Sequence, residues 1–249
     1  MYMPVIRGII ERRILINYRV DPQLLERLLP PPFRPQLVNG YGLGGICLIR
    51  LNHMRPRMAP AWLGVRSENA AHRVAVQWDE AAEVRSGVFV MRRESDSHIN
   101  VLAGGRLFPG QHQRAEFSVQ ESGNHYSVQV SGGSVRLTFA GRLASHLPTS
   151  SVFRSIEDAS AFFARGALGY SPARVAGTFD ALELQSDTWN VEPLEMTALQ
   201  SSFFDDQSRF PGEAVQFDCA LLMRNIPHHW HAHPSLCCPA TVGHEHASV

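Results

Sequence analysis

The feature that most constrains the fold of this chain is a pair of short runs in which apolar and polar residues alternate. The runs flank the sequence Ser-Gly-Gly-Ser at 131–134, and their apolar members are Tyr126, Val128, Val130, Val135, Leu137 and Phe139. Strict alternation places these side chains on one face of two strands, and a short Gly-rich connection predicts an antiparallel hairpin. We therefore expect a protein built mainly from strands.

Further apolar and β-branched runs predict strands at 9–20, 46–51, 65–78, 88–93, 174–188 and 215–226. The predicted helices are few, and each follows an N-capping residue: Asp21 before Pro22, Ser95 before 96–107, and Ser155, with Asp158 completing a capping box, before 156–168. Because strands outnumber helices, we predict a mostly β fold of the α+β class. It should form one domain over 1–233, followed by a loosely ordered tail over 234–249.

The balance of charges excludes two classes of partner. The 249 residues include 23 basic and 23 acidic side chains, and neither sign forms a long run, so we expect no nucleic acid and no membrane as a partner. No apolar run is long enough to cross a bilayer, and the first residues lack a secretory signal pattern. The four cysteines form no dense framework, so we expect thiols in a cytoplasmic protein.

The sequence contains no lysine, so every strongly basic side chain is an arginine. Lysine is the side chain that forms Schiff bases, and imine catalysis by a side-chain amine is therefore excluded. No cofactor is expected. The glycines at 40–45 superficially suggest a dinucleotide-binding loop, but the residues after them predict a strand, where that motif requires a helix.

The segment 14–33, ILINYRVDPQLLERLLPPPF, places a strand before a short amphipathic helix and a proline-rich stop. Together with residues 87–117, this segment resembles acetoacetate decarboxylase and a related bacterial family of unknown function. The likeness extends over residues 10–140. It implies an acetoacetate decarboxylase-like β-barrel or cone that has a few short helices and encloses a cavity.

The resemblance also implies where a site would lie. Acetoacetate decarboxylases use a buried Schiff-base lysine shortly after the short helix, where this chain has Leu107-Phe108-Pro109-Gly110-Gln111-His112. The family's glutamate falls in the region of Glu68, and its arginine falls near Arg12 and Arg13, between which the resemblance does not choose. It therefore implies the cavity and argues against the decarboxylase reaction.

Strand geometry adds a prediction for residues 66–78. Alternate side chains of a strand share a face, so Arg66, Glu68 and His72 are expected on the same side as the apolar residues at 74, 76 and 78. Buried charge is costly unless it is paired or used. This favours a cavity in which Glu68 is a general acid or base and Arg66 or Arg12 binds a carboxylate. The alternative is a bulge that reverses the parity and leaves a solvated ion pair.

Polar residues also surround the position of the missing lysine. Of these, His112 is the natural proton carrier, because histidine ordinarily titrates near neutrality. Gln111 and Arg114 are expected to anchor a ligand. The alternative for His112 is a solvated loop residue without a role.

A cluster of histidines occurs at 228–233. On an extended strand His229, His231 and His233 would share a face, an arrangement that suits a transition metal. No cysteine or carboxylate lies at a recognised zinc spacing, so we expect adventitious metal binding and no functional metal site. Trp230 is expected to be a core or interface anchor, and Cys47 an inert core residue.

These observations favour an enzyme that acts on a small organic acid or keto compound by acid and base catalysis, as a lyase or isomerase without a Schiff-base lysine. Its expected catalytic residues are Glu68 and His112, and its expected substrate-binding residues are Arg12, Arg66, His72, Gln111 and Arg114. The alternatives are a non-catalytic ligand-binding protein that retains the pocket, and metal-dependent chemistry at the histidine cluster. Strand edges and the apolar pair Phe203-Phe204 predict a homo-oligomer.

Overall fold

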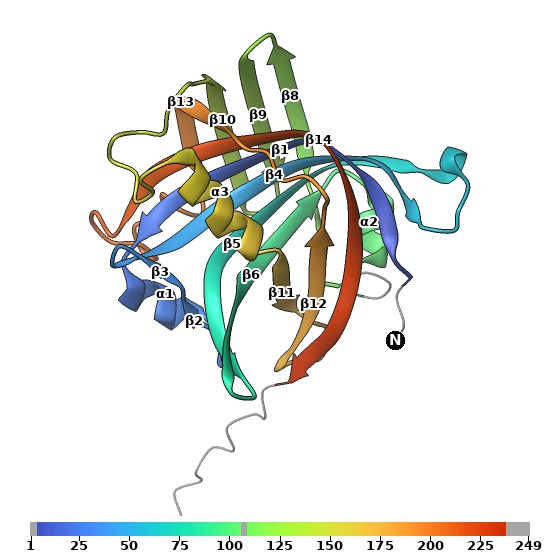
Figure 1. Ribbon diagram of the computed structural model, residues 1–249, viewed down its shortest axis with the longest axis horizontal. Coiled ribbons are helices and arrows are strands. Elements are labelled where there is room, and N and C mark those ends of the chain that lie inside the picture. Colours follow the sequence, from blue (N-terminus) through green and yellow to red (C-terminus); the bar gives the residue numbers. More distant parts are fainter. Residues whose placement is uncertain (1–3, 106–108, 238–249) are drawn as a thin grey trace, which may run out of the picture.

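The computed structural model describes residues 4–105 and 109–237, whose strands form one sheet that closes into a ring (Figure 1). The strands follow one another around the ring, and the last returns to pair antiparallel with the first. In order, they are β1 (Ile6–Val20), β4 (Tyr41–Pro56), β5 (Val65–Glu80), β6 (Glu83–Ser95), β11 (Leu168–Pro172), β12 (Thr178–Gln185) and β14 (Val215–Cys237). The prediction of a mostly β fold is confirmed.

A second row of strands extends the sheet from β14. In order, these are β13 (Glu192–Ser201), β10 (Val135–Leu143), β9 (His125–Gly132) and β8 (Glu116–Ser122). The predicted hairpin is β9 and β10, in which Val135 lies opposite Gly132 and Phe139 opposite Val128. Three two-residue strands pair with β5, β4 and β6 respectively: β2 (Arg34–Pro35), β3 (Leu37–Val38) and β7 (Gln113–Arg114).

The helices are short, as predicted. They are α1 (Pro22–Leu28), α2 (His98–Ala103), α3 (Ile156–Arg165) and the 3-10 turn η1 (Ala61–Leu63). Asp21 and Ser155 cap α1 and α3 by accepting hydrogen bonds from backbone N–H groups of Gln23 and Asp158. The predicted start of α2 was wrong, because Ser97 supplies its cap and Ser95 ends β6. Within the described residues, every helix is too short or too polar to span a membrane.

Strands β1, β4 and β5 are buried on both faces, and each face packs against a different apolar cluster. Ile14 and Leu48 point toward a cluster that includes α1, β9 and β10. Their chain neighbours Leu15 and Ile49 point the other way, toward the cluster of α3. Because neither face of these strands is exposed, an apolar pattern in the sequence does not tell which side encloses a cavity.

Two expectations drawn from the second half of the chain were wrong. Phe204 is 1% exposed and stacks on Tyr18 with ring centroids 4.2 Å apart, while Phe203 packs edge-on against it. These rings therefore fill the core and offer no surface for self-association, which stays a prediction. Strand β14 continues through Cys237, so residues 234–237 are not a tail; residues 238–249 lie outside the described residues.

Candidate functional site

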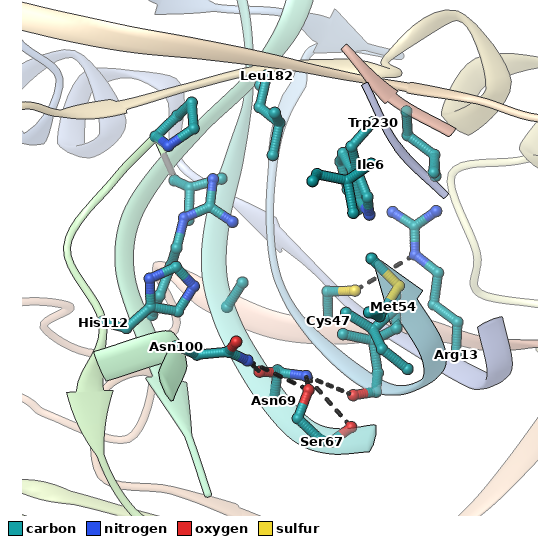
Figure 2. A pocket seen from close by; sticks show the side chains of 18 of the residues that line it. Ile6, Arg13, Cys47, Met54, Ser67, Asn69, Asn100, His112, Leu182 and Trp230 are labelled. Atoms are coloured by element: carbon teal, nitrogen blue, oxygen red, sulfur yellow. Dashed lines mark hydrogen bonds between the residues drawn. The ribbon is translucent and has the colours of Figure 1, made fainter. Parts of the chain in front are cut away.

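A cavity of about 340 Å³ lies inside the ring, and every strand of the ring contributes to its wall (Figure 2). Most of the wall is apolar, with Leu51, Val65, Val90 and Leu184 among the lining residues. Leu63 and Ile99, which also line it, are 48% and 57% exposed and mark its mouth. A small organic molecule fits such a cavity, and its apolar wall favours a ligand with a hydrocarbon part.

One row of residues crosses three strands on the cavity side of the sheet. Cys47 on β4 lies opposite Ala71 on β5, which lies opposite Arg93 on β6. Arg13 and Arg73 lie in the neighbouring rows, and all five residues line the cavity. We call these five residues the cavity floor. The short side chain of Ala71 leaves space at its centre, between the guanidinium groups.

Arg93 is held at the cavity floor by a hydroxyl group. Its Nε and Nη2 donate hydrogen bonds to Ser171 Oγ at 3.3 and 2.8 Å. Burial lowers the pKa of Arg93 to about 10, so the guanidinium remains charged at neutral pH. The contacts therefore fix the position of the charge without neutralising it.

Arg73 is 4% exposed and reaches across β4 to β1. Its Nη2 donates to Asn17 Oδ1 at 2.7 Å, and its guanidinium carbon lies 4.9 Å from the ring centroid of Phe163. The residue between Arg73 and Asn17 in the sheet is Gly45, which has no side chain to block this reach. Burial lowers the pKa of Arg73 to about 10, and the nearby charge of Arg13 acts in the same direction.

Arg13 completes the set of charges. Its Nε donates to Cys47 Sγ at 3.3 Å, its Nη1 approaches Met223 Sδ at 4.0 Å, and its guanidinium carbon lies 5.3 Å from the ring centroid of Trp189. Of Arg12 and Arg13, it is Arg13 that faces the cavity.

Among the residues that the structure describes, none of Arg13, Arg73 and Arg93 forms an ion pair with a carboxylate. Glu94, the one acidic residue among those lining the cavity, instead pairs with Arg92 and lies 3.5 Å from His72 Nδ1. Burying cations without a counter-ion is costly, and a bound anion offsets that cost. The cavity is therefore electrostatically suited to a negatively charged ligand.

Besides Arg13, the alternative to Arg12, His112 is the predicted site residue that the structure places in the cavity wall. Burial and the charge of Arg93 lower its pKa to about 4, so the imidazole is neutral at pH 7 and is a weaker base than an ordinary histidine. Gln111 and Arg114 are exposed and line no part of this cavity. Gln111 Nε2 donates to the Ala173 carbonyl, and Arg114 Nη1 donates to the carbonyls of Ser95 and Ala115.

The structure does not place Arg66, Glu68 or His72 in the cavity. His72 and Val74 lie on the same face of β5, as predicted. That face, however, packs against the cluster containing Phe204. The cavity lies on the opposite face, where β5 presents Ser67, Asn69, Ala71 and Arg73. Arg66 is 59% exposed and pairs with Glu11 at 3.3 Å. Both faces of β5 are buried, and the sequence analysis assigned the cavity to the face that packs against the core.

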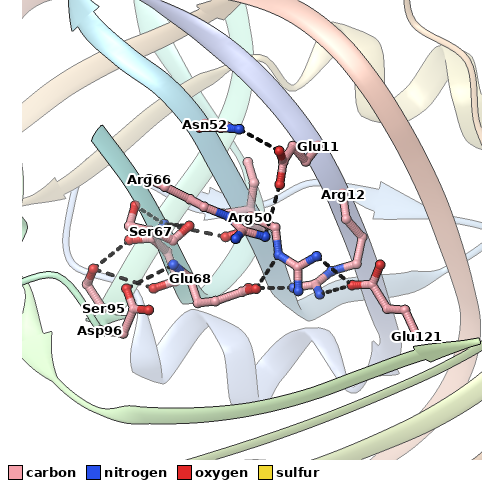
Figure 3. A network of polar contacts seen from close by, with 12 residues as sticks. Glu11, Arg12, Arg50, Asn52, Arg66, Ser67, Glu68, Ser95, Asp96 and Glu121 are labelled. Carbon is pink, nitrogen blue, oxygen red and sulfur yellow. Dashed lines mark hydrogen bonds and ion pairs between the residues drawn. The ribbon is translucent and has the colours of Figure 1, made fainter. Parts of the chain in front are cut away.

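Glu68 belongs instead to a network of ion pairs outside the cavity (Figure 3). Its carboxylate pairs with Arg12 and Arg50, and both arginines also pair with Glu121 of β8. The network contains two cations and two carboxylates, so its charges balance. Arg12 was predicted to bind substrate and Glu68 to be catalytic, but the two side chains form an ion pair with each other.

The histidines at 228–233 do not converge. His233 Nε2 lies 2.8 Å from Glu183 Oε2, while His228 is 1% exposed. Within the described residues, no three metal-ligating side chains group closely enough to hold an ion. Trp230 packs against the apolar cluster of α3, as expected of a core anchor, and also lines the cavity. Cys47, Cys219 and Cys237 are free thiols.

Sequence reasoning missed Arg73, Arg93 and a cluster of amides beside the floor. Asn69 Nδ2 donates to Ser67 Oγ at 2.9 Å, and Asn100 Nδ2 donates to Asn69 Oδ1 at 3.1 Å. Arg73 lies among apolar neighbours on a buried strand, and a charged residue in such a run could have been recognised as a candidate site residue. Arg93 follows an irregularity in the pairing of β5 with β6, and no sequence pattern shows which side of the sheet it faces.

The fold is that of acetoacetate decarboxylase-like proteins. The structure matches acetoacetate decarboxylase from Legionella pneumophila with a TM-score of 0.64 and 11% identity, over 92% of this chain and 85% of that one. An acetoacetate decarboxylase-like enzyme from Sphingomonas wittichii RW1 matches with a TM-score of 0.62 and 11% identity, over 96% and 94%. The enduracididine biosynthesis enzyme MppR, complexed with pyruvate, matches with a TM-score of 0.59 and 10% identity, over 95% and 91%.

The chain belongs to the family DUF2071, described as an uncharacterized conserved protein, whose model matches residues 10–222. No curated protein sequence gives a significant match. At these identities the structural matches establish the fold, and the resemblance drawn from the sequence is confirmed at that level.

Proposed function

We propose that this protein binds a small organic acid in the cavity of the ring, with the carboxylate held by Arg13, Arg73 and Arg93. The observation that carries the proposal is the set of three buried or half-buried guanidinium groups that lack a carboxylate partner among the described residues. Guanidinium groups bind carboxylates through paired, charge-assisted hydrogen bonds. The apolar wall would receive the rest of the acid, and a similar fold in MppR holds pyruvate.

For a catalysed reaction, His112 is the proton carrier in this proposal. Its neutral imidazole can remove a proton next to the carbonyl group of a keto acid, and the guanidinium groups stabilise the negative charge that develops. Since the chain has no lysine, the reaction would proceed without a Schiff base, as an isomerisation or a lyase reaction. Glu68, bonded to two arginines outside the cavity, has no part in it.

The alternative function is binding without catalysis. It is favoured by the surroundings of His112, which forms no ion pair with a carboxylate among the described residues and therefore lacks an acidic partner for proton relay.

Calorimetric titration with pyruvate and with its methyl ester tests the binding proposal. We expect pyruvate to bind and the uncharged ester to bind at least about tenfold more weakly, because a charge-assisted hydrogen bond contributes roughly 1.5–3 kcal/mol. Arg93→Met should weaken pyruvate binding by a similar factor, while Arg66→Met, a change of an exposed arginine, should not. Equal binding of acid and ester, or equal effects of the two variants, contradicts the anion site.

Proton exchange then separates the two functions. The methyl protons of bound pyruvate are followed by NMR in D₂O. Exchange that depends on the protein and is lost in His112→Gln supports catalysis, whereas tight binding without exchange supports the alternative.

A further inference from the structure

Cys47 belongs to the apolar cluster of α3, as expected of a core residue, and its place in the cavity wall also suits a nucleophile. It lies in the central row of the cavity floor, next to the short side chain of Ala71, and is one of the residues that line the cavity. The residue is buried, with 6% of its surface exposed, and it forms part of the cavity wall. A small molecule that enters the cavity therefore meets the thiol.

Three positive charges surround this thiol. Arg13 Nε donates a hydrogen bond to Cys47 Sγ at 3.3 Å, which Figure 2 shows from the cavity side. Arg93 lies in the same row as Cys47, with Ala71 between them, and Arg73 lies in the neighbouring row; both line the same cavity. Reactive cysteines in proteins occupy partly accessible, electropositive surroundings of this kind.

A second observation points to a ligand beside the thiol. Arg73 is 4% exposed, yet its buried Nε has no hydrogen-bond partner among the described residues. A buried donor without an acceptor is costly, and Arg73 is one of the residues that line the cavity. A carboxylate at the floor would supply the missing acceptor and would lie within reach of Cys47.

The two other described cysteines have different surroundings and provide internal controls. Cys219 is 0% exposed, and burial and the charge of Asp218 raise the pKa of its thiol. Cys237 is exposed near the end of β14. It forms no hydrogen bond or ion pair with an arginine among the described residues.

We propose that Cys47 is a nucleophilic thiol that forms a covalent adduct with electrophilic carboxylic acids held by the arginines of the cavity floor. With an α-halo acid, the sulfur forms a bond to the α-carbon and the carbon–halogen bond breaks. The halide leaves with the bonding electron pair, and the thiol proton passes to water. The carboxylate is unchanged and stays with the guanidinium groups. The proposal rests on the anion site of the proposed function.

Competitive labelling with iodoacetate and iodoacetamide tests the inference. The two reagents deliver nearly the same group to sulfur, but only iodoacetate is an anion. The full-length protein is treated with each, and the rate at each cysteine is followed by peptide mass spectrometry. For each cysteine, the labelling rate with iodoacetate is divided by the rate with iodoacetamide. Cys237 gives this ratio for an exposed thiol, so the ratio at Cys47 is divided by the ratio at Cys237, and the result is the quotient that we compare.

We expect this quotient to exceed about 10, since electrostatic focusing raises the local concentration of an anion by 10-fold or more, and to fall as salt is added. Arg93→Met should reduce the quotient several-fold, while Arg66→Met should not change it. Cys47→Ser should remove labelling at this position, and its melting temperature checks that it is folded. Excess pyruvate should slow the reaction of Cys47 and leave Cys237 unaffected.

Two results would overturn the inference, and they differ in what they say about the proposed function. If pyruvate binds by calorimetry but neither reagent labels Cys47 faster than the buried Cys219, the anion site stands and the nucleophile is refuted. If both reagents label Cys47 with a quotient near 1 and pyruvate does not bind, the anion site itself is refuted.

Discussion

Arg12 Nη2 donates a hydrogen bond to Glu68 Oε2 at 2.6 Å, from a side chain that is 2% exposed. The bond joins β1 to β5, and the second hydrogen bond of Arg12, to Glu121, joins them to β8. The charge of Arg12 is balanced by two carboxylates, whereas none of the three arginines of the cavity floor pairs with a carboxylate among the described residues. Arg12 therefore has a structural role, whereas the arginines of the cavity floor have a proposed role in ligand binding.

Glu68→Gln should therefore destabilise the protein without changing its affinity for pyruvate. Removing one partner of a buried ion pair costs about 3 kcal/mol, because the remaining cation keeps its desolvation penalty. Urea denaturation measures the loss, and calorimetry measures the affinity. Glu11→Gln, which removes the partner of the exposed Arg66, serves as the control and should cost less than about 1 kcal/mol. A tenfold loss of pyruvate affinity in Glu68→Gln would restore Glu68 to the site.

Arg93→Met should stabilise the ligand-free protein. The native guanidinium is buried without a counter-ion among the described residues, and replacing such a charge with an apolar side chain of similar length gains about 1–2 kcal/mol. Thermal unfolding with and without pyruvate is the measurement: the variant should melt higher alone and gain less from pyruvate. A variant that melts lower in both conditions would show that Arg93 supports the fold and would contradict the anion site.

Ala71→Leu should fill the floor of the cavity and abolish pyruvate binding while the protein stays folded. Ala71 lies between Cys47 and Arg93, so a larger side chain occupies the space proposed for the carboxylate. The matched control is Ala220→Leu, a change of a 0% exposed alanine that lies in the core cluster and does not line the cavity. That change overpacks a core and should cost about 1–3 kcal/mol. Unchanged binding in Ala71→Leu would place the ligand elsewhere.

Acid should destabilise the protein through two histidines. The folded-state pKa of His112 and of His228 is lowered to about 4, mainly by burial. Each therefore contributes stability that is present above the unfolded pKa of about 6.5 and is lost as the pH falls toward 4. Between pH 7 and pH 5 the loss is about 2 kcal/mol for each histidine.

Urea denaturation at pH 7 and pH 5 measures this dependence. His112→Gln should lose about 2 kcal/mol less than the wild type between these pH values. His98→Gln, a change at an exposed position of α2, should lose as much as the wild type. A pH dependence identical in all three proteins would contradict the burial of His112.

Local rules predicted part of the architecture and the resemblance implied the barrel, whereas strands β11 and β13 were not predicted. Alternation and the Gly-Gly turn predicted β9 and β10, and the side chains of Asp21 and Ser155 predicted the starts of two helices. The candidate site was harder, because strands β1, β4 and β5 are apolar on both faces. Arg12 and Arg13 are adjacent in sequence, and only the closed ring shows that Arg13 faces the cavity while Arg12 faces two carboxylates.

The absence of a partner cannot be predicted from sequence either. Arg73 and Arg93 stand on strands that also contain Glu68 and Glu94, so a list of residues suggests balanced charge. In the structure both glutamates pair with other arginines, Arg12, Arg50 and Arg92. An unpaired charge is a property of three-dimensional neighbours, which depend on pairings between strands far apart in the chain.

The pairing of β14 with β1 has a consequence for how the protein is made. Ile6 and Trp230 lie opposite each other and both belong to the cavity wall, although more than two hundred positions separate them in translation order. The cavity wall is therefore incomplete until β14 pairs with β1. Contacts of such high sequence separation form slowly, so the burial of the arginines of the cavity floor is completed late in folding.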